Sequence, residues 1–120
     1  MFFFCRSEDK GKTWCFYPLI EQANRERPRE YFFLNKETGW FTLFRPDTLI
    51  NPQIGDNIIL KTTDGGKTWL KKLDKRFDPP HVLLSIEFAD SLKGMCPSRS
   101  YLLVYTTDGG ETWIQDSSFI

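Results

Sequence analysis

One octapeptide pattern occurs three times in this chain of 120 residues, and it constrains the fold more than any other feature. The pattern is S/T-x-D-x-G-x-T-W, and we call each copy a box. The fixed positions are Ser7, Asp9, Gly11, Thr13 and Trp14, then Thr62, Asp64, Gly66, Thr68 and Trp69, and finally Thr106, Asp108, Gly110, Thr112 and Trp113. Chance does not plausibly match five positions in three copies. Such a repeat indicates stacked supersecondary units that bury their apolar sides against one another.

The spacing of the boxes defines the repeating unit. The boxes begin at residues 7, 62 and 106, so the first interval is longer than the second. Gly39 and Gly94 each lie 25 residues after the preceding box tryptophan, so the intervals diverge only beyond these glycines. Residues 45–55 have the length and the loop composition of an 11-residue insertion. The unit is therefore 44 residues long, and one copy carries an insertion.

Each unit predicts four short strands. Aromatic residues make up 16% of the chain, and Gly, Asp and Pro separate the apolar runs, which favours strands. The expected strands are 31–35, 40–44, 57–62 and 68–73 in one unit, and 82–88, 95–97, 101–106 and 112–120 in the next. Only segment 19–27 is compatible with a helical turn or two. Four strands in a period of about 40–45 residues are typical of a β-propeller blade.

We therefore expect an all-β fold of four-stranded antiparallel blades, about two and a half in number. Residues 1–18 would supply the last two strands of a blade, 19–73 a complete blade with the 45–55 insertion, and 74–120 a second complete blade. Known propellers close with four or more blades. We expect the chain to be a segment of a longer propeller; self-association that completes a ring and an open arc with exposed edges are the alternatives.

Every fixed box residue has an expected structural role. The Asp carboxylate can accept hydrogen bonds from the amides of its own turn. The glycine at the fifth position permits the positive φ at which the chain reverses. The tryptophan can pack against the neighbouring blade, and its indole N–H then needs one partner. We expect the boxes to stabilise the fold and not to bind a ligand.

The boxes resemble Asp-box (BNR) repeats, which occur in sialidases and in sortilin-type propellers. The extended pattern combines a Phe strand, Gly39-Trp40 and T-T-D-G-G-x-T-W. It is most similar to the photosystem II assembly-factor family and its uncharacterised bacterial relatives. The resemblance implies a β-propeller whose box turns lie away from the ligand site, in proteins that are often exported. It does not specify a function, because a fold does not fix one.

Composition argues against several other classes of function. Sixteen basic and sixteen acidic residues give a formal net charge of zero, so nothing indicates nucleic acid or an anionic membrane as a partner. The apolar run 1–5 is too short for a signal peptide, and no segment is long enough to span a bilayer. One histidine and three cysteines without C-x-x-C spacing predict no metal site, and we expect no cofactor.

The cysteines and the histidine have expected positions. Cys5 and Cys15 align with apolar residues of the other units, which predicts small core residues. Because they flank one hairpin, a disulfide between them stays open. His81 follows two prolines, and we expect it at the surface or on a rim of the fold.

The candidate binding face carries the variable loops 21–30, 45–55 and 74–80. In a four-stranded blade these loops emerge on the face opposite the boxes, and loops on a rigid scaffold commonly carry binding. The candidate residues are Arg25, Arg27, Arg29, Arg45, Lys75 and Arg76. Arginines bind carboxylates well, so we predict an acidic or carboxylate-bearing segment of a protein partner. The alternative interpretation is that these charges only keep an aromatic-rich fold soluble.

We expect no catalytic residues. A fragment of a sialidase-like glycoside hydrolase is the alternative, because Phe44-Arg45-Pro46 resembles the Phe-Arg-Ile-Pro signature of sialidases without its isoleucine. Tyr31 and Glu30 could be proposed as nucleophile and base, but neighbouring strand positions point to opposite faces. A carboxylate pair across a cleft would need opposed blades. The sequence therefore favours a non-catalytic protein-interaction module.

Overall fold

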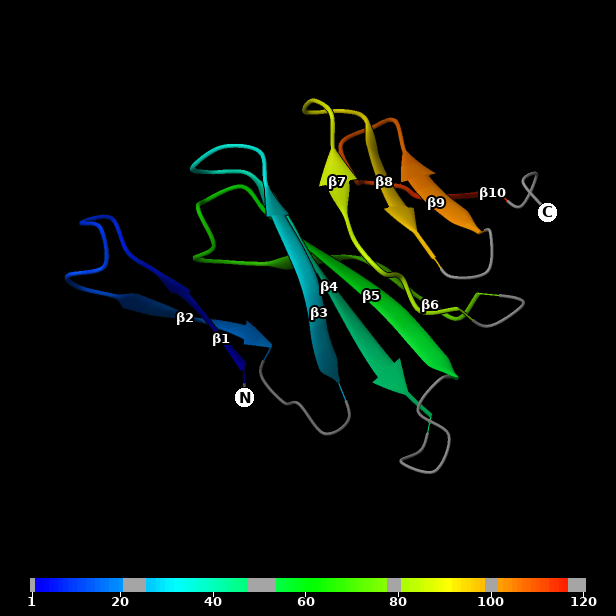
Figure 1. Cartoon of the computed structure of the whole chain (residues 1–120), viewed down its shortest axis with the longest axis horizontal. Helices are drawn as coiled ribbons and strands as arrows, with labels where there is room; N and C mark the ends of the chain where they lie inside the picture. The colour runs from blue at the N-terminus through cyan, green and yellow to red at the C-terminus, as the bar shows by residue number, and fades with distance from the viewer. Residues whose placement is uncertain (1, 21–25, 48–53, 78–80, 99–101, 117–120) are drawn as a thin grey trace.

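The computed structural model of the chain describes residues 2–20, 26–47, 54–77, 81–98 and 102–116. These residues form three antiparallel sheets and no helix, which confirms the all-β, propeller-type fold class (Figure 1). In particular, none of the described residues forms a helix that could cross a membrane.

The three sheets follow one another along the chain. A hairpin of β1 (Phe2–Arg6) and β2 (Cys15–Ile20) encloses the first box. The second sheet has the order β3 (Arg27–Phe33), β4 (Gly39–Pro46), β5 (Gly55–Thr62) and β6 (Leu70–Lys75). The third repeats this order with β7 (Glu87–Phe88), β8 (Gly94–Pro97), β9 (Leu103–Thr106) and β10 (Ile114–Asp116). Each four-stranded sheet is an up-and-down meander, as in a propeller blade.

The insertion lengthens one hairpin. Arg45 pairs with Asp56 and Pro46 pairs with Gly55, so the ends of segment 45–55 continue β4 and β5. These two strands have 8 residues each, whereas β8 and β9 have 4 each. Residues 48–53 lie outside the described residues. The second sheet therefore has the longest strands of the three sheets.

One expectation about secondary structure is wrong, and a second is tested only at the two ends of its segment. Segment 82–88 is a strand only at Glu87–Phe88, preceded by an isolated bridge between Leu83 and Ser98. Leu83 and Ile86 are both buried, and residues three apart in a strand would point to opposite faces, so the chain leaves the sheet to bury both. Segment 19–27 is extended at both described ends, because β2 continues to Ile20 and β3 begins at Arg27. Residues 21–25 lie outside the described part.

The two faces of each sheet are named by the order of the blades along the chain. The downstream face of the second sheet is the one that packs on the third, the upstream face is the one that packs on the first hairpin, and the corresponding faces of the other sheets carry the same names. In the main core, Trp40 on the downstream face of the second sheet is fully buried and stacks on Phe88 of the third, with ring centroids 3.4 Å apart. Ile59, Cys96 and Val104 complete the centre of this core. Burial raises the pKa of the Cys96 thiol, which keeps it protonated. The blades are thus joined through apolar faces.

The first junction repeats this arrangement on a smaller scale. Phe4 of β1 lies 5.4 Å from Phe33 and 5.5 Å from Trp69 of the second sheet, between ring centroids. Arg6 Nη1 donates hydrogen bonds to the carbonyl oxygens of Lys36 and Gly65, at 2.9 and 3.0 Å. The two-stranded hairpin is therefore fixed to the second sheet by aromatic contacts and by the two hydrogen bonds of the Arg6 guanidinium.

A buried asparagine fixes the connection between the second and third sheets. Asn57 Nδ2 donates to the His81 carbonyl at 2.7 Å, and the Leu83 amide donates to Asn57 Oδ1 at 3.1 Å. His81 is only 5% exposed, so its expected surface position is wrong. Burial lowers the pKa of the His81 imidazole, since the charged form loses water. The side chain is carried inward because Asn57 anchors its backbone to β5.

The cysteines of the hairpin are not core residues. Cys5 and Cys15 are exposed free thiols. Cys15 pairs with Arg6 while Cys5 pairs with Phe16, so the two sulfurs lie on opposite faces of the hairpin and form no disulfide with each other. The expected burial fails for Cys15 because its aligned residues, Leu70 and Ile114, are themselves 62% and 44% exposed. Cys5 lies on a face that the described residues leave uncovered.

Candidate binding surface

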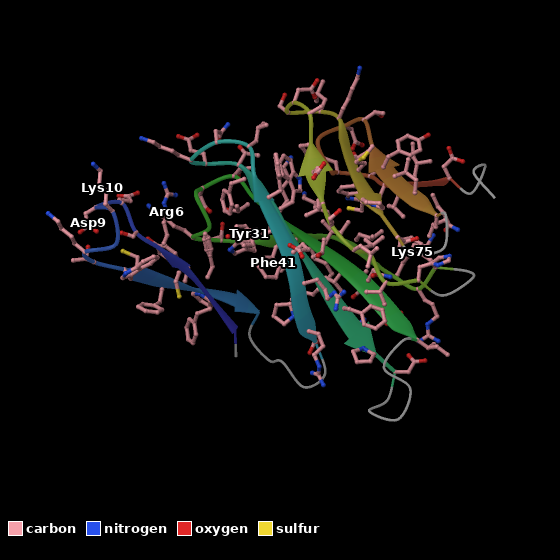
Figure 2. All side chains as sticks on the ribbon, viewed as in Figure 1. Arg6, Asp9, Lys10, Tyr31, Phe41 and Lys75 are labelled. Carbon is pink, nitrogen blue, oxygen red and sulfur yellow. The ribbon has the colours of Figure 1, made fainter. Side chains whose placement is uncertain are left out.

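The antiparallel order gives each blade two different ends. The box turns share one end with the turns between β3 and β4 and between β7 and β8, which we call the box end (Figure 1). The opposite end, where the β4–β5 hairpin extends to Pro46 and Gly55 and where β3 begins and β6 ends, is called the loop end. Lys75 lies on the opposite side of the molecule from Asp9 and Lys10 (Figure 2). The two ends differ in how their charges are used.

At the box end, the carboxylates are used within their own turns. Asp64 Oδ1 accepts hydrogen bonds from the Thr68 amide at 2.9 Å and from the Thr62 hydroxyl at 2.8 Å, and Asp64 Oδ2 accepts from the Thr68 hydroxyl. The bonds from Thr68 lower the pKa of Asp64 to about 2. Trp69 Nε1 donates to the Gly66 carbonyl at 2.9 Å. These contacts recur in the other two boxes.

The first box departs from the others at its fourth position. Lys10 has a φ of 61°, close to the 75° and 77° of Gly65 and Gly109 in the other boxes. A Cβ added at Gly65 would overlap Arg6 Nη1 and would lie 3.1 Å from the Lys36 carbonyl oxygen. One added at Gly109 would lie 2.9 Å from the Ser91 carbonyl oxygen. Both carbonyls belong to the turn between the first two strands of a blade. No such turn lies beside the first box among the described residues, which explains why a side chain fits there.

At the loop end, Arg45 is the centre of an ion-pair network. Its Nη2 lies 3.0 Å from Asp56 Oδ2 and 2.7 Å from Asp74 Oδ1, and its Nη1 lies 3.9 Å from Glu26 Oε1. The hydrogen bond to Asp56 raises the pKa of Arg45. Lys71 shares Asp74 at 2.9 Å. Arg45 therefore ties together strands β4, β5 and β6.

Arg76 extends the same network. It pairs with Asp47 and approaches Asp56, with Nε and Oδ1 3.8 Å apart. The structure thus brings Arg45 and Arg76 together through a shared carboxylate, and both charges are balanced within the chain. Sequence reasoning missed these acidic partners. Of these partners, only Asp56 could have been found from the sequence. It lies opposite Arg45 in the β4–β5 hairpin, so the hairpin register would have indicated the pair.

The other candidate cations are arranged differently. Arg27 and Arg29 are exposed on β3, and exposed Lys75 on β6 places its Nζ 5.5 Å from the centre of the Phe77 ring. Between Pro28 and Tyr31 the strand bulges, which offsets its register against β4. Arg25 lies outside the described residues. Among the candidate cations, Arg45 and Arg76 are therefore paired with carboxylates, and Arg29 and Lys75 are exposed.

Beside this bulge, the hydroxyl of buried Thr42 is the hydrogen-bonding partner of the Glu30 backbone. Its hydroxyl accepts a hydrogen bond from the Glu30 amide at 3.1 Å and donates to the Glu30 carbonyl at 3.3 Å. Thr42 is 2% exposed, so an unpaired hydroxyl there would be costly. The bulge that presents Arg29 is thus built into the sheet.

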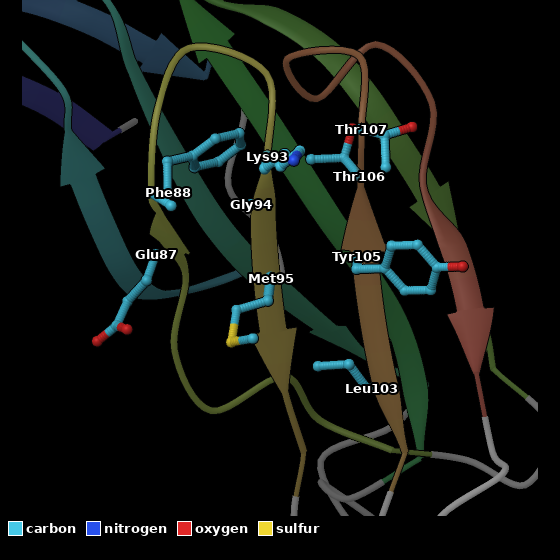
Figure 3. Close-up of a pocket in the computed structure, with 10 residues that line it drawn as sticks. Glu87, Phe88, Lys93, Gly94, Met95, Leu103, Tyr105, Thr106 and Thr107 are labelled. Carbon is cyan, nitrogen blue, oxygen red and sulfur yellow. The ribbon is translucent and has the colours of Figure 1, made fainter.

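A separate hollow lies on the downstream face of the third sheet. Its volume is about 500 Å³, and it is lined mainly by apolar atoms of β8 and β9. Met95, Leu103 and Tyr105 project from these strands into the hollow, with Glu87 and Lys93 near its rim (Figure 3). Met95 is 45% exposed. This surface was not singled out by the sequence, because its residues look like ordinary strand residues.

Comparison with known proteins shows the fold. No protein-family model and no curated protein matches the chain. A solved structure described as YCF48 bound to D1 peptide has a TM-score of 0.64 and 23% identity, covering 94% of this chain and 33% of that one. YCF48 from Cyanidioschyzon merolae gives a TM-score of 0.51 at 18% identity, covering 79% and 25%. The chain thus spans a third or less of these β-propellers, and identities this low show shared architecture alone.

Proposed function

We propose that this chain is a non-catalytic protein-binding module of Asp-box blades, and that its loop end holds an acidic or carboxylate-bearing segment of the partner. The observation that carries the proposal is the division of the loop-end cations. Arg45 and Arg76 are committed to internal carboxylates, while Arg29 and Lys75 are exposed beside them. The first pair stabilises the surface, and the second pair is available to a partner.

The ion-pair network supports this division of roles. Arg45 joins the ends of three strands, so this end of the sheet is held in a fixed arrangement. A preorganised surface loses less conformational entropy when it binds. An exposed guanidinium group on such a surface can form paired, charge-assisted hydrogen bonds with a carboxylate. The arrangement therefore suits a short acidic segment.

The comparison with known structures supports protein binding by analogy. One of the structures that share the fold is described as YCF48 bound to D1 peptide, so a propeller of this type can hold a peptide. The analogy concerns the architecture only, since the same fold can carry unrelated functions. It gives no residue of this chain a role.

The contacts of the residues considered for catalysis also favour a binding role. Arg45, the candidate for a substrate carboxylate, is paired with Asp56 and Asp74. Tyr31, the candidate nucleophile, lies parallel to the Phe41 ring at 6.4 Å on the upstream face of the second sheet. Both side chains already contribute to the packing of the blade.

The experiment is a selection followed by a titration. Random peptides displayed on phage are selected on the immobilised chain, and the enriched peptides are expected to be rich in Asp and Glu. A fluorescent copy of the strongest is then titrated by anisotropy. Arg29→Ala with Lys75→Ala should weaken binding about tenfold or more, since each hydrogen bond between charged groups contributes roughly 1.5–3 kcal/mol.

The matched control removes the same charge from the box end. Lys12→Ala with Lys67→Ala changes two exposed lysines of the box turns, and affinity should stay within about twofold of the unchanged chain. Equal weakening by both pairs would mean that only net charge matters. Enriched peptides without acidic residues would contradict the proposed partner chemistry.

A further inference from the structure

Two sheet faces are left uncovered by the described residues. One carries exposed aromatic side chains and the other carries an apolar hollow. The first is the upstream face of the β1–β2 hairpin, where Phe3, Trp14 and Phe16 are 53%, 54% and 64% exposed. The second is the downstream face of the third sheet, which carries the hollow formed by Met95 and its neighbours. The other apolar sheet faces in the described chain meet at the two junctions, where Phe4 contacts Phe33 and Trp40 contacts Phe88.

The two internal junctions follow one rule of packing. A downstream aromatic residue of one blade packs on a phenylalanine of the next, and that phenylalanine packs beside the box tryptophan of its own blade. Phe4 contacts Phe33, which lies 6.0 Å from Trp69. Trp40 contacts Phe88, which also lies 6.0 Å from Trp113. The box tryptophan thus belongs to the upstream surface that a preceding blade covers.

A polar contact accompanies each junction. Arg6 of the preceding blade donates to the Gly65 carbonyl, and Trp40 donates through Nε1 to the Gly109 carbonyl at 3.1 Å. Both acceptors are the fourth residue of a box. Tyr105 directly precedes the third box, just as Arg6 precedes the first, so it has the same place in its blade as one of these two donors.

We propose that a second copy of this chain docks head to tail, with the upstream face of its β1–β2 hairpin on the downstream face of the third sheet. Trp14 of one copy enters the hollow between Met95, Leu103 and Tyr105 of the other. The Tyr105 hydroxyl donates to the Lys10 carbonyl, the equivalent of the Gly65 and Gly109 acceptors. The occupant follows from continuity, because the contact repeats the interface between successive blades.

The contact is heterologous, since it joins two different surfaces of the chain. Such contacts form closed rings when the rotation between copies permits closure, and open chains when it does not. The interface uses neither Arg29 nor Lys75, so it is independent of the proposed binding at the loop end. Failure of one proposal leaves the other standing.

The first test measures mass by sedimentation velocity. Up to about 100 μM, where an interface with a micromolar dissociation constant is largely occupied, the unchanged chain should form species heavier than a monomer. Trp14→Glu and Leu103→Asp should each yield monomers, because each buries a charge in an apolar contact. Met95→Lys tests the same face if Leu103→Asp does not fold, as judged by circular dichroism.

The decisive test mixes the two blocked variants. Trp14→Glu retains an intact third sheet and Leu103→Asp retains an intact hairpin face, so an equimolar mixture should form a one-to-one dimer and nothing larger. Isotope-labelling one variant and recording native mass spectra identifies that mixed dimer. Self-association of either variant alone would mean that like faces pair, which overturns the head-to-tail proposal.

A control variant distinguishes this contact from nonspecific association through exposed apolar residues. Leu70 is 62% exposed on β6 and belongs to neither uncovered face, so Leu70→Asp should leave the mass distribution unchanged. An unchanged chain that stays monomeric at about 100 μM would overturn the proposal. So would a mixture of blocked variants that remains entirely monomeric, or a loss of association in the Leu70 control.

Discussion

The box end and the loop end both depend on carboxylates, but they use them over different distances in the sequence. Asp64 is bonded to residues two and four positions away. Asp74 at the loop end pairs with Arg45, which lies 29 positions earlier. The box network forms wherever its octapeptide forms a turn, whereas the loop-end network forms only after three strands are assembled. The box end thus reports local folding, and the loop end reports the completed sheet.

Burial, and not position at one end or the other, should decide the size of a mutational effect. Asn57 tests this most strongly, because it is 2% exposed and bonds both the His81 carbonyl and the Leu83 amide. Asn57→Ala leaves two backbone groups unsatisfied and should lower the free energy of unfolding by about 2–5 kcal/mol. Urea denaturation followed by tryptophan fluorescence measures the change. A loss under about 1 kcal/mol would contradict the assigned role of Asn57.

The buried hydroxyl of the second box should give the next largest effect. Thr62 is 1% exposed, and its Oγ1 accepts a hydrogen bond from the buried Gly66 amide at 2.9 Å. Thr62→Val keeps the shape of the side chain, leaves that amide unsatisfied and should cost about 1–3 kcal/mol of unfolding free energy. Thr62→Ser, which keeps the hydroxyl, is the matched control and should lose less. Equal losses for both would mean that the methyl group matters and the hydrogen bond does not.

Arg45 should contribute less, although it has more ion pairs than any other described residue. Its side chain is 30% exposed, so water and salt screen the pairs. Arg45→Met should lower the free energy of unfolding by about 1 kcal/mol or less at low salt. The difference from the unchanged chain should shrink further in 1 M NaCl, because the Debye length falls to about 3 Å. A large loss that is insensitive to salt would show that the network acts as a buried one.

The smallest expected effect concerns the exceptional fourth position of the first box. Lys10 adopts a left-handed conformation, which disfavours a side chain by roughly 1–2 kcal/mol. Lys10→Gly relieves this strain but adds freedom to the unfolded chain, so a net stabilisation of about 1 kcal/mol or less is expected. Gly65→Lys in the second box is the contrasting variant and should destabilise, because the Arg6 guanidinium and the Lys36 carbonyl occupy the space that its Cβ needs. Similar effects of both changes would contradict the explanation given for Lys10.

What the sequence made predictable follows the same division. The boxes, the strands that flank them and the repeated unit all depend on contacts within a few residues, and the all-β propeller fold was predicted from them. The division of the chain at residues 18 and 73 and the binding role of the loop-end cations remain predictions. The acidic partners of Arg45 could not be predicted, because they approach it only through the assembled sheet.

The wrong predictions also arose from long-range packing. His81 was expected at the surface because prolines precede it. The side-chain amide of Asn57 on β5 bonds the His81 carbonyl, and this contact holds His81 in the interior. Segment 82–88 looked like a strand by composition, and the need to bury both Leu83 and Ile86 breaks it. Cys15 was assigned to the core by alignment with Leu70, although the aligned position is itself exposed. An apolar residue in a repeat indicates a recurring position and not a buried one.

The equivalence of the three boxes is the central claim, and a titration of their carboxyl groups by carbon-13 NMR tests it most directly. Hydrogen bonds from Thr13 and Thr68 lower the pKa of both Asp9 and Asp64 to about 2, and those from Thr112 lower the pKa of Asp108 further. Since the unfolded values are higher, the boxes stabilise the fold above pH of about 4, and this contribution is lost as the pH falls toward 2. The account predicts that all three carboxyls titrate well below the ordinary value of 3.8. An ordinary pKa for any one of them would contradict it.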